Sequence, residues 1–196
     1  MATFDSIWKD LQAKKFAPIY FLCGEESYYI DLIEDFIATN SLQPHEKDFN
    51  FSLFYGKDAD PITILNDVKQ YPTFADRRVV IVREAQDIKV KDWEVFEKYI
   101  EHPINSSILI FAHKNKTLDK RTKIAKLIEK KTTYFESKKI AENELPNWIA
   151  NYVNNRGFKI NDDATRVLAE NIGNDLSRIS NELDKLSVML SDNAII

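Results

Sequence analysis

The sequence has little cysteine, glycine or proline, and it has no long apolar run. Cys23 is the only cysteine among 196 residues, so an intrachain disulfide is impossible and a cysteine-based zinc site would lack ligands. Four glycines and six prolines exclude a collagen-like fibre and a low-complexity linker. The N-terminal segment carries Asp5, Trp8 and Lys9 where a signal peptide needs an apolar core, and no stretch reaches the length of a membrane-spanning helix. We therefore expect a cytoplasmic protein with no membrane partner.

The residues that are present are typical of a globular protein. Hydrophobic residues make up 44% of the chain and charged residues 30%, which is enough to bury a core and excludes a disordered chain. The net charge of −4 hides an asymmetry, because segment 114–131 holds eight basic and two acidic residues and carries +6, which leaves −10 elsewhere. The overall charge disfavours a dedicated nucleic-acid binder, whereas this segment keeps such a contact open.

Short apolar runs alternate with amphipathic stretches in the first 140 residues, and this pattern predicts a mostly parallel α/β sheet. Thr3 is the expected N-cap of the first helix, and Asp60 followed by Pro61 marks the start of another. The alternating aromatic and aliphatic residues of 48–55 predict a strand with one buried face. The predicted strands are 19–23, 48–55, 79–82, 107–112 and 132–135, and the predicted helices are 4–11, 27–37, 60–70, 92–100 and 119–130.

The strand signals stop near residue 140, and three helical patterns follow. Gly157 and Gly173 are expected to end the first two helices, Asn161 or Asp162 to cap the second, and Asn174 to cap the third. We therefore predict an α/β domain over residues 1–140 and a small three-helix lid domain over residues 141–196.

The first turn between strand and helix, at Gly24, is where an α/β fold of this kind would hold phosphate. A phosphate-binding loop needs a second glycine, a lysine and a hydroxyl at fixed spacing. Glu25 and Glu26 place negative charge in the turn instead, and Arg83 stands where an acidic metal ligand would end the third strand. The three required positions are occupied by Tyr29, Ile30 and Asp31. We predict that the chain does not hydrolyse ATP.

Three motifs give the chain a resemblance to the delta subunit family of the bacterial DNA polymerase III clamp loader. They are PIYFLCGEE at 18–26, YPTFADRRVVIV at 71–82 and GNDLSRISNELDKL at 173–186. The resemblance implies an AAA+-like α/β domain with a degenerate nucleotide site, then a lid. Members of the family carry a third, helical collar domain, which this chain does not include.

The resemblance also implies a function and its partners. Members of the family bind and open the beta sliding clamp during replication without hydrolysing ATP, in a complex with gamma/tau and delta prime subunits and primer-template DNA. The family's apolar clamp contact maps onto Thr73 and Phe74, with Tyr71 and Pro72 as neighbouring apolar surface. Thr73 departs from the usual bulky aliphatic residue. Read from the residues alone, Phe74 has an alternative role in packing on its own sheet.

The basic segment has two interpretations. Lys120, Arg121 and Lys123 would face template or primer phosphates in an assembled loader, or they lie on an ordinary solvated helix face. Arg77 and Arg78 are expected at a polar strand entry, with a contact to acidic clamp residues as the alternative.

No constellation for catalysis emerges from the sequence. Asp31, Glu34 and Asp35 recur at helical spacing, and we interpret them as a solvated helix face, because no histidine lies at ligand spacing. The three histidines are scattered, so no Ser-His-Asp arrangement follows. We therefore predict no catalytic, metal-binding or cofactor-binding residue. Two rival functions stay open: a small phosphate-binding α/β enzyme using the turn at Gly24, and a nucleic-acid-binding adaptor using the basic segment.

Overall fold

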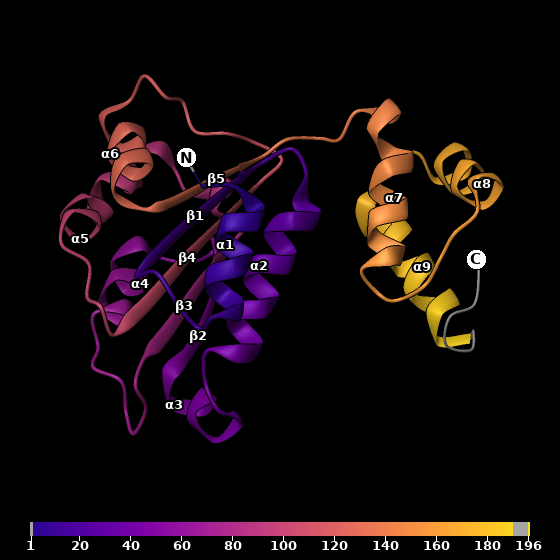
Figure 1. Ribbon diagram of the computed structural model, residues 1–196. Helices are drawn as coiled ribbons and strands as arrows, with labels where there is room; N and C mark the ends of the chain where they lie inside the picture. The colour runs from indigo at the N-terminus through magenta and orange to yellow at the C-terminus, as the bar shows by residue number, and fades with distance from the viewer. Residues whose placement is uncertain (1, 190–195) are drawn as a thin grey trace. The chain divides into compact units, whose positions relative to one another are not determined.

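The computed structural model describes residues 2–189 and 196. The chain divides into two compact units, Met1–Lys138 and Lys139–Ile196 (Figure 1). Within the described residues, no helix is long and apolar enough to cross a membrane.

Unit 1 is built on a five-stranded sheet in which every pair of neighbouring strands is parallel. The strand order is β2-β3-β4-β1-β5, so β1 is central and β2 and β5 are the edges. Parallel neighbours require crossover helices, and the alternating apolar runs of the sequence supply them. The predicted parallel sheet flanked by helices is confirmed. The strands are Ile19–Gly24 (β1), Phe51–Tyr55 (β2), Arg78–Arg83 (β3), Ser107–Lys114 (β4) and Thr133–Ser137 (β5).

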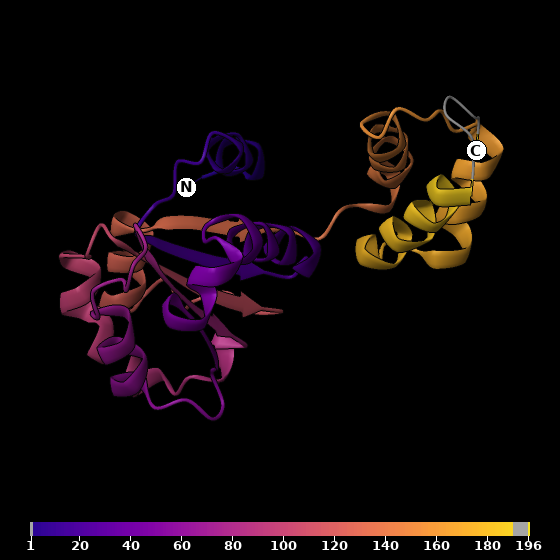
Figure 2. The same cartoon turned by 90° about the horizontal axis from the view of Figure 1, so that it is seen from below.

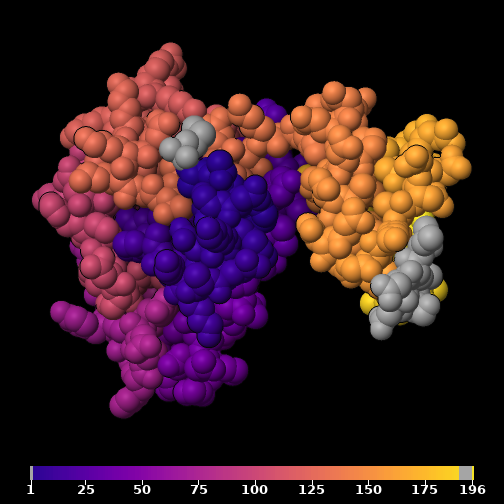
Figure 3. Space-filling model, viewed as in Figure 1, coloured from indigo at the N-terminus to yellow at the C-terminus, as the bar shows by residue number. Residues whose placement is uncertain are grey.

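Two helices cover one face of the sheet. They are α1 (Phe4–Gln12) and α2 (Ser27–Asn40), and their apolar stripes pack on alternate residues of the buried strands. Figure 2 shows α1 on the side of the sheet away from the helices of the other face. In the space-filling view the N-terminal segment, in indigo, covers much of this face of unit 1 (Figure 3). Thr3 caps α1 as predicted, by accepting a hydrogen bond from the main-chain N–H of Ser6.

The opposite face carries α4 (Pro61–Val68), a 3-10 stretch at Val90–Phe96, α5 (Glu97–Glu101) and α6 (Lys123–Lys131). Aromatic rings dominate this half of the core. Trp93 lies against both Phe21 and Phe111, with ring centroids 5.6 and 4.9 Å apart. Asp60 caps α4 as predicted, by accepting from the main-chain N–H of Thr63.

Three predicted elements differ from the structure. The strand predicted at 48–55 begins only at Phe51, because α3 (Lys47–Asn50) forms a helical turn after the 3-10 turn Pro44–Glu46. The helix predicted from residue 92 is mostly 3-10, and the one predicted from residue 119 begins at Lys123. Two further 3-10 turns lie at Ala85–Asp87 and Glu142–Glu144.

Unit 2 contains three α-helices, α7 (Leu145–Asn154), α8 (Asp162–Ile172) and α9 (Leu176–Met189). Asn161 caps α8, which settles one of the two predicted candidates. The predicted cap of α9 is wrong by one residue: the carboxylate of Asp175, not the amide of Asn174, accepts from the main-chain N–H of Arg178. The Tyr152 hydroxyl donates to Asp184 at 2.8 Å and so joins α7 to α9.

Candidate functional site

The carboxyl ends of β1 and β4 form the crevice where an open α/β sheet would bind a nucleotide. The helix after β1 covers one face of the sheet and the helix after β4 covers the other, so the chain changes direction between these neighbouring strands. This is the position at which the sequence analysis sought a phosphate loop at Gly24.

The donors of this crevice are already engaged by the chain itself. The main-chain N–H of Gly24 donates to the carbonyl of Lys116 at 3.1 Å, and that of Glu25 donates to Ser137 at 3.0 Å. Glu26 is buried and caps α2 by accepting from the main-chain N–H of Tyr28. A carboxylate therefore lies at the helix N-terminus, where a phosphate would otherwise bind.

Ion pairs fill the rest of this edge. Asp31, at the position of the metal-binding hydroxyl, pairs with Lys114 at the end of β4. Glu34 accepts from Arg83, at the end of β3, at 2.5 Å. Burial raises the pKa of Glu34, and the bond to Arg83 opposes that rise. The interpretation of these acids as a solvated helix face is wrong for Glu34, which is only 1% exposed.

The opposite edge of the sheet, at the amino ends of the strands, presents an exposed apolar loop. This loop is residues 69–77, between α4 and β3, and we call it the apolar loop. Tyr71 is 87% exposed and Phe74 is 97% exposed. The alternative in which Phe74 packs on its own sheet is therefore wrong. Phe74 also has a φ of +51°, in the left-handed region that costs an L-residue about 1–2 kcal/mol.

The apolar loop is held at several points. Asn50, just before β2, bonds both the N–H and the C=O of Thr73. Arg77 lies over the ring of Phe16, with its guanidinium carbon 4.8 Å from the ring centre. Arg78 is buried, pairs with Asp67, and donates to the carbonyl of Phe49 at 2.8 Å. Arg78 is thus turned inward, which contradicts the alternative in which it meets acidic residues of a partner.

Phe49 adds an apolar side chain that the sequence analysis placed on a strand face. It is 64% exposed, and its neighbour Asn50 contacts Thr73, so Phe49 belongs to the same end of the sheet as Tyr71 and Phe74. The sequence pattern hid this because phenylalanine at alternate positions is typical of a buried strand face.

The basic segment is largely neutralised at the residues we singled out. Lys120 pairs with Glu136 at 2.8 Å, Arg121 pairs with Asp119 at 2.7 Å, and Lys123 pairs with Glu97. The bonds to Arg121 hold the pKa of Asp119 near 2. The cations of the segment that form no ion pair with any described residue are Lys116, Lys126, Lys130 and Lys131.

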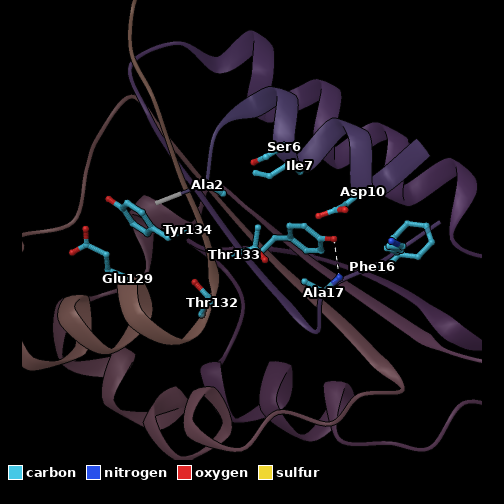
Figure 4. Close-up of a pocket in the computed structure, with 12 residues that line it drawn as sticks. Ala2, Ser6, Ile7, Asp10, Phe16, Ala17, Glu129, Thr132, Thr133 and Tyr134 are labelled. Atoms are coloured by element: carbon cyan, nitrogen blue, oxygen red, sulfur yellow. Dashed lines mark hydrogen bonds between the residues drawn. The ribbon is translucent and has the colours of Figure 1, made fainter. Parts of the chain in front are cut away.

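A pocket of about 450 Å³ lies between α1, the start of β1 and the end of α6 (Figure 4). The Tyr20 hydroxyl accepts from the main-chain N–H of Ala17 beside it, at 2.8 Å. Its acidic side chains are Asp10 and Glu129, and Lys15 is its basic one. Throughout residues 2–189, no group of three or more His, Cys, Asp or Glu side chains is placed to hold a metal ion.

Comparison with known proteins identifies the family. Residues 20–138 match the family of the DNA polymerase III delta subunit. The curated DNA polymerase III subunit delta of Bacillus subtilis is 26% identical over 195 residues, which cover 95% of this chain and 56% of that protein. The chain thus spans little more than half the length of this relative.

Solved structures give the same result. The B. subtilis DNA clamp loader delta protein superposes with a TM-score of 0.81 at 26% identity, over 99% of this chain and 60% of that one. A DNA polymerase III gamma subunit-related protein of Thermotoga maritima gives a TM-score of 0.51 at 14% identity, over 94% of this chain and 58% of that one. RuvB of the same organism gives 0.50 at 16%, over 96% and 62%. The last two likenesses concern the fold alone.

The resemblance inferred from the three sequence motifs is therefore confirmed, as is the AAA+-like fold. The family match covers more than half of the residues and includes the whole of the sheet except its first position, Ile19. The chain belongs to the DNA polymerase III delta subunit family.

Proposed function

We propose that this chain is the part of a clamp-loader delta subunit that binds and opens the sliding clamp, with the apolar loop as its contact. The observation that carries the proposal is Phe74, a large aromatic side chain held almost fully in solvent on a strained main chain. Backbone strain of this kind persists only where the surrounding structure enforces it, and it concentrates at ligand contacts. Units 1 and 2 are, in this proposal, the AAA+-like domain and its lid.

The expected contact is an aromatic hot spot. A buried aromatic anchor truncated to alanine typically costs at least about 2 kcal/mol, which is roughly thirtyfold in affinity. Tyr71 and Pro72 supply further apolar surface beside Phe74, and Thr73 contributes little because its short side chain replaces a bulky aliphatic one. Most of the affinity should therefore depend on Phe74.

Opening of the clamp follows from differential affinity. A protein shifts the equilibrium of a closed ring only by the amount by which it binds the open form more tightly. The chain itself supplies no nucleotide chemistry to this step in our proposal, because the main-chain N–H groups of Gly24 and Glu25 are engaged internally and Glu26 caps α2. ATP would act through the partner subunits, gamma/tau and delta prime.

Primer-template DNA is the remaining proposed partner. In the assembled loader the basic segment would approach its phosphates, with Lys120, Arg121 and Lys123 first exchanging their carboxylate partners for phosphate. Binding of a fluorescent duplex to the assembled loader at several salt concentrations tests this. Substitution of these three residues should reduce the salt dependence, and an unchanged slope would exclude the contact.

The direct test is surface-plasmon binding of this chain to the cognate sliding clamp. Phe74→Ala should weaken binding about thirtyfold or more. Val90→Ala is the matched control, because Val90 is 77% exposed in a different segment of unit 1 and its truncation should leave affinity unchanged. Equal binding by both variants would move the contact away from Phe74, and no binding by the unaltered chain would contradict the proposed function.

A further inference from the structure

Asn50 makes three hydrogen bonds with its side chain although it lies outside the regular sheet. Its Oδ1 accepts from the main-chain N–H of Thr73 at 2.7 Å, and its Nδ2 donates to the Thr73 carbonyl at 2.8 Å. Nδ2 also donates to the carbonyl of Glu46 at 2.9 Å. Both amide hydrogens are therefore used, and the side chain is 0% exposed.

These bonds fall where main-chain pairing stops. The ladder between β2 and β3 begins at Phe51 opposite Val79, one residue after Asn50. In the described residues, the main-chain hydrogen bonds that flank the apolar loop end at Gln70 and resume at Arg78. The amide of Asn50 thus takes the place of a strand main chain and continues the pairing to the residue before Phe74.

Asn50 is itself held from the other side. Arg78 donates to the carbonyl of Phe49, and its guanidinium is paired with Asp67 in α4. The segment before β2, the end of α4 and the start of β3 are therefore linked in one buried polar network. Because Asn50 fixes both polar groups of Thr73, it also fixes the orientation of the peptide that leads into Phe74.

We propose that Asn50 is a positioning residue for the clamp-binding loop, which holds Thr73 so that Phe74 is presented in its left-handed, solvent-exposed conformation. This inference rests on the function proposed above. Ordering a loop before binding reduces the conformational entropy lost on binding. Release of one or two loop residues should therefore weaken clamp binding about tenfold, without removing any atom that touches the clamp.

The test is a double-mutant cycle on clamp affinity with the single variants Asn50→Ala and Phe74→Ala and the variant that carries both. Asn50→Ala should weaken binding about tenfold when Phe74 is present and have little effect when Phe74 is already alanine. Asn50→Asp keeps the size of the side chain but sets a carboxylate against two carbonyls, so it should weaken binding as much as Asn50→Ala. Circular dichroism verifies that each variant is folded.

A second measurement separates positioning from general destabilisation. Hydrogen exchange of the Thr73 amide, followed by NMR, should accelerate in Asn50→Ala and stay slow in Tyr134→Phe. The latter removes a hydroxyl hydrogen bond at the other edge strand of the same unit and serves as the matched control.

The outcomes are distinct. If the unaltered chain binds the clamp and Phe74→Ala weakens binding, but Asn50→Ala leaves affinity unchanged, the positioning role is refuted while the proposed function stands. An equal loss for Asn50→Ala in both backgrounds also refutes it, because the effect would not pass through Phe74. If the unaltered chain does not bind the clamp, the proposed function fails and the positioning role fails with it.

Discussion

The left-handed main chain at Phe74 predicts that glycine at this position stabilises the fold. Phe74 is 97% exposed, so its side chain adds little packing that a substitution could remove. Its φ of +51° is unfavourable for any residue with a Cβ atom, whereas glycine adopts that region at no steric cost. Phe74→Gly should therefore abolish clamp binding and raise the free energy of unfolding at once.

The expected magnitude follows from two opposing terms. Relief of the left-handed conformation is worth about 1–2 kcal/mol. The greater freedom of glycine in the unfolded chain offsets about 0.5–1 kcal/mol of that gain. The net effect should be a stabilisation of about 0.5–1 kcal/mol. Phe74→Ala keeps the Cβ atom and the strain, so its free energy of unfolding should stay close to that of the unaltered chain.

Urea unfolding followed by tryptophan fluorescence measures this difference. Trp148 lies in α7 of unit 2, so a Trp148→Phe background restricts the signal to Trp8 and Trp93 of unit 1. The decisive comparison is between Phe74→Gly and Phe74→Ala in that background. If the glycine variant is less stable than the alanine variant, the left-handed main chain is not strained and the reasoning is refuted.

Three further predictions concern buried titratable groups. Burial raises the pKa of the Cys23 thiol to about 11, so a thiol reagent at pH 8 should label it only on unfolding, and fast labelling of the folded chain would contradict this. Burial lowers the pKa of His113, so its NMR titration should fall below pH 6.5, and its contribution to stability should be present above pH 6.5 and decline as the pH falls below it; a native pKa at or above 6.5 would refute this. Burial raises the pKa of Glu34, so stability due to this group should fall as the pH rises above 4.5 through the native pKa. The unfolding free energy of Glu34→Gln relative to the unaltered chain should rise over the same range, and a flat difference would show that the native pKa is not raised.

Much of the fold was predictable because its signals are local. Apolar runs such as 79–82 and 107–112 belong to central strands covered on both faces, and such strands need no partner to be identified. The caps at Thr3 and Asp60 were identified for the same reason, since a cap bonds a main-chain N–H three residues ahead. Local bonds also end some predictions early: Asp119 bonds Arg121, Thr122 caps α6, and the helix begins later than its apolar periodicity suggests.

The parts that the sequence did not reveal depend on contacts between distant residues. Asn50 bonds Thr73, 23 positions away, and with its bond to Glu46 it favours a helical turn where the alternating phenylalanines indicated a strand. Glu34 meets Arg83 from 49 positions away, so its burial was invisible in a pattern of helical spacing. The interest in Phe74 came from the family resemblance, and only the structure shows that its side chain is exposed.

Gly24 has a consequence for how such chains change over time. A Cβ atom at this position would lie 1.9 Å from the carbonyl oxygen of Ser137, so any other residue would push β5 away from β1. The glycine is required by the closeness of two strands, independently of any phosphate. A chain of this fold can therefore lose every other residue of a nucleotide loop and still be unable to replace its first glycine. A glycine at that position is evidence of tight strand packing, and it carries no information on whether the protein uses ATP.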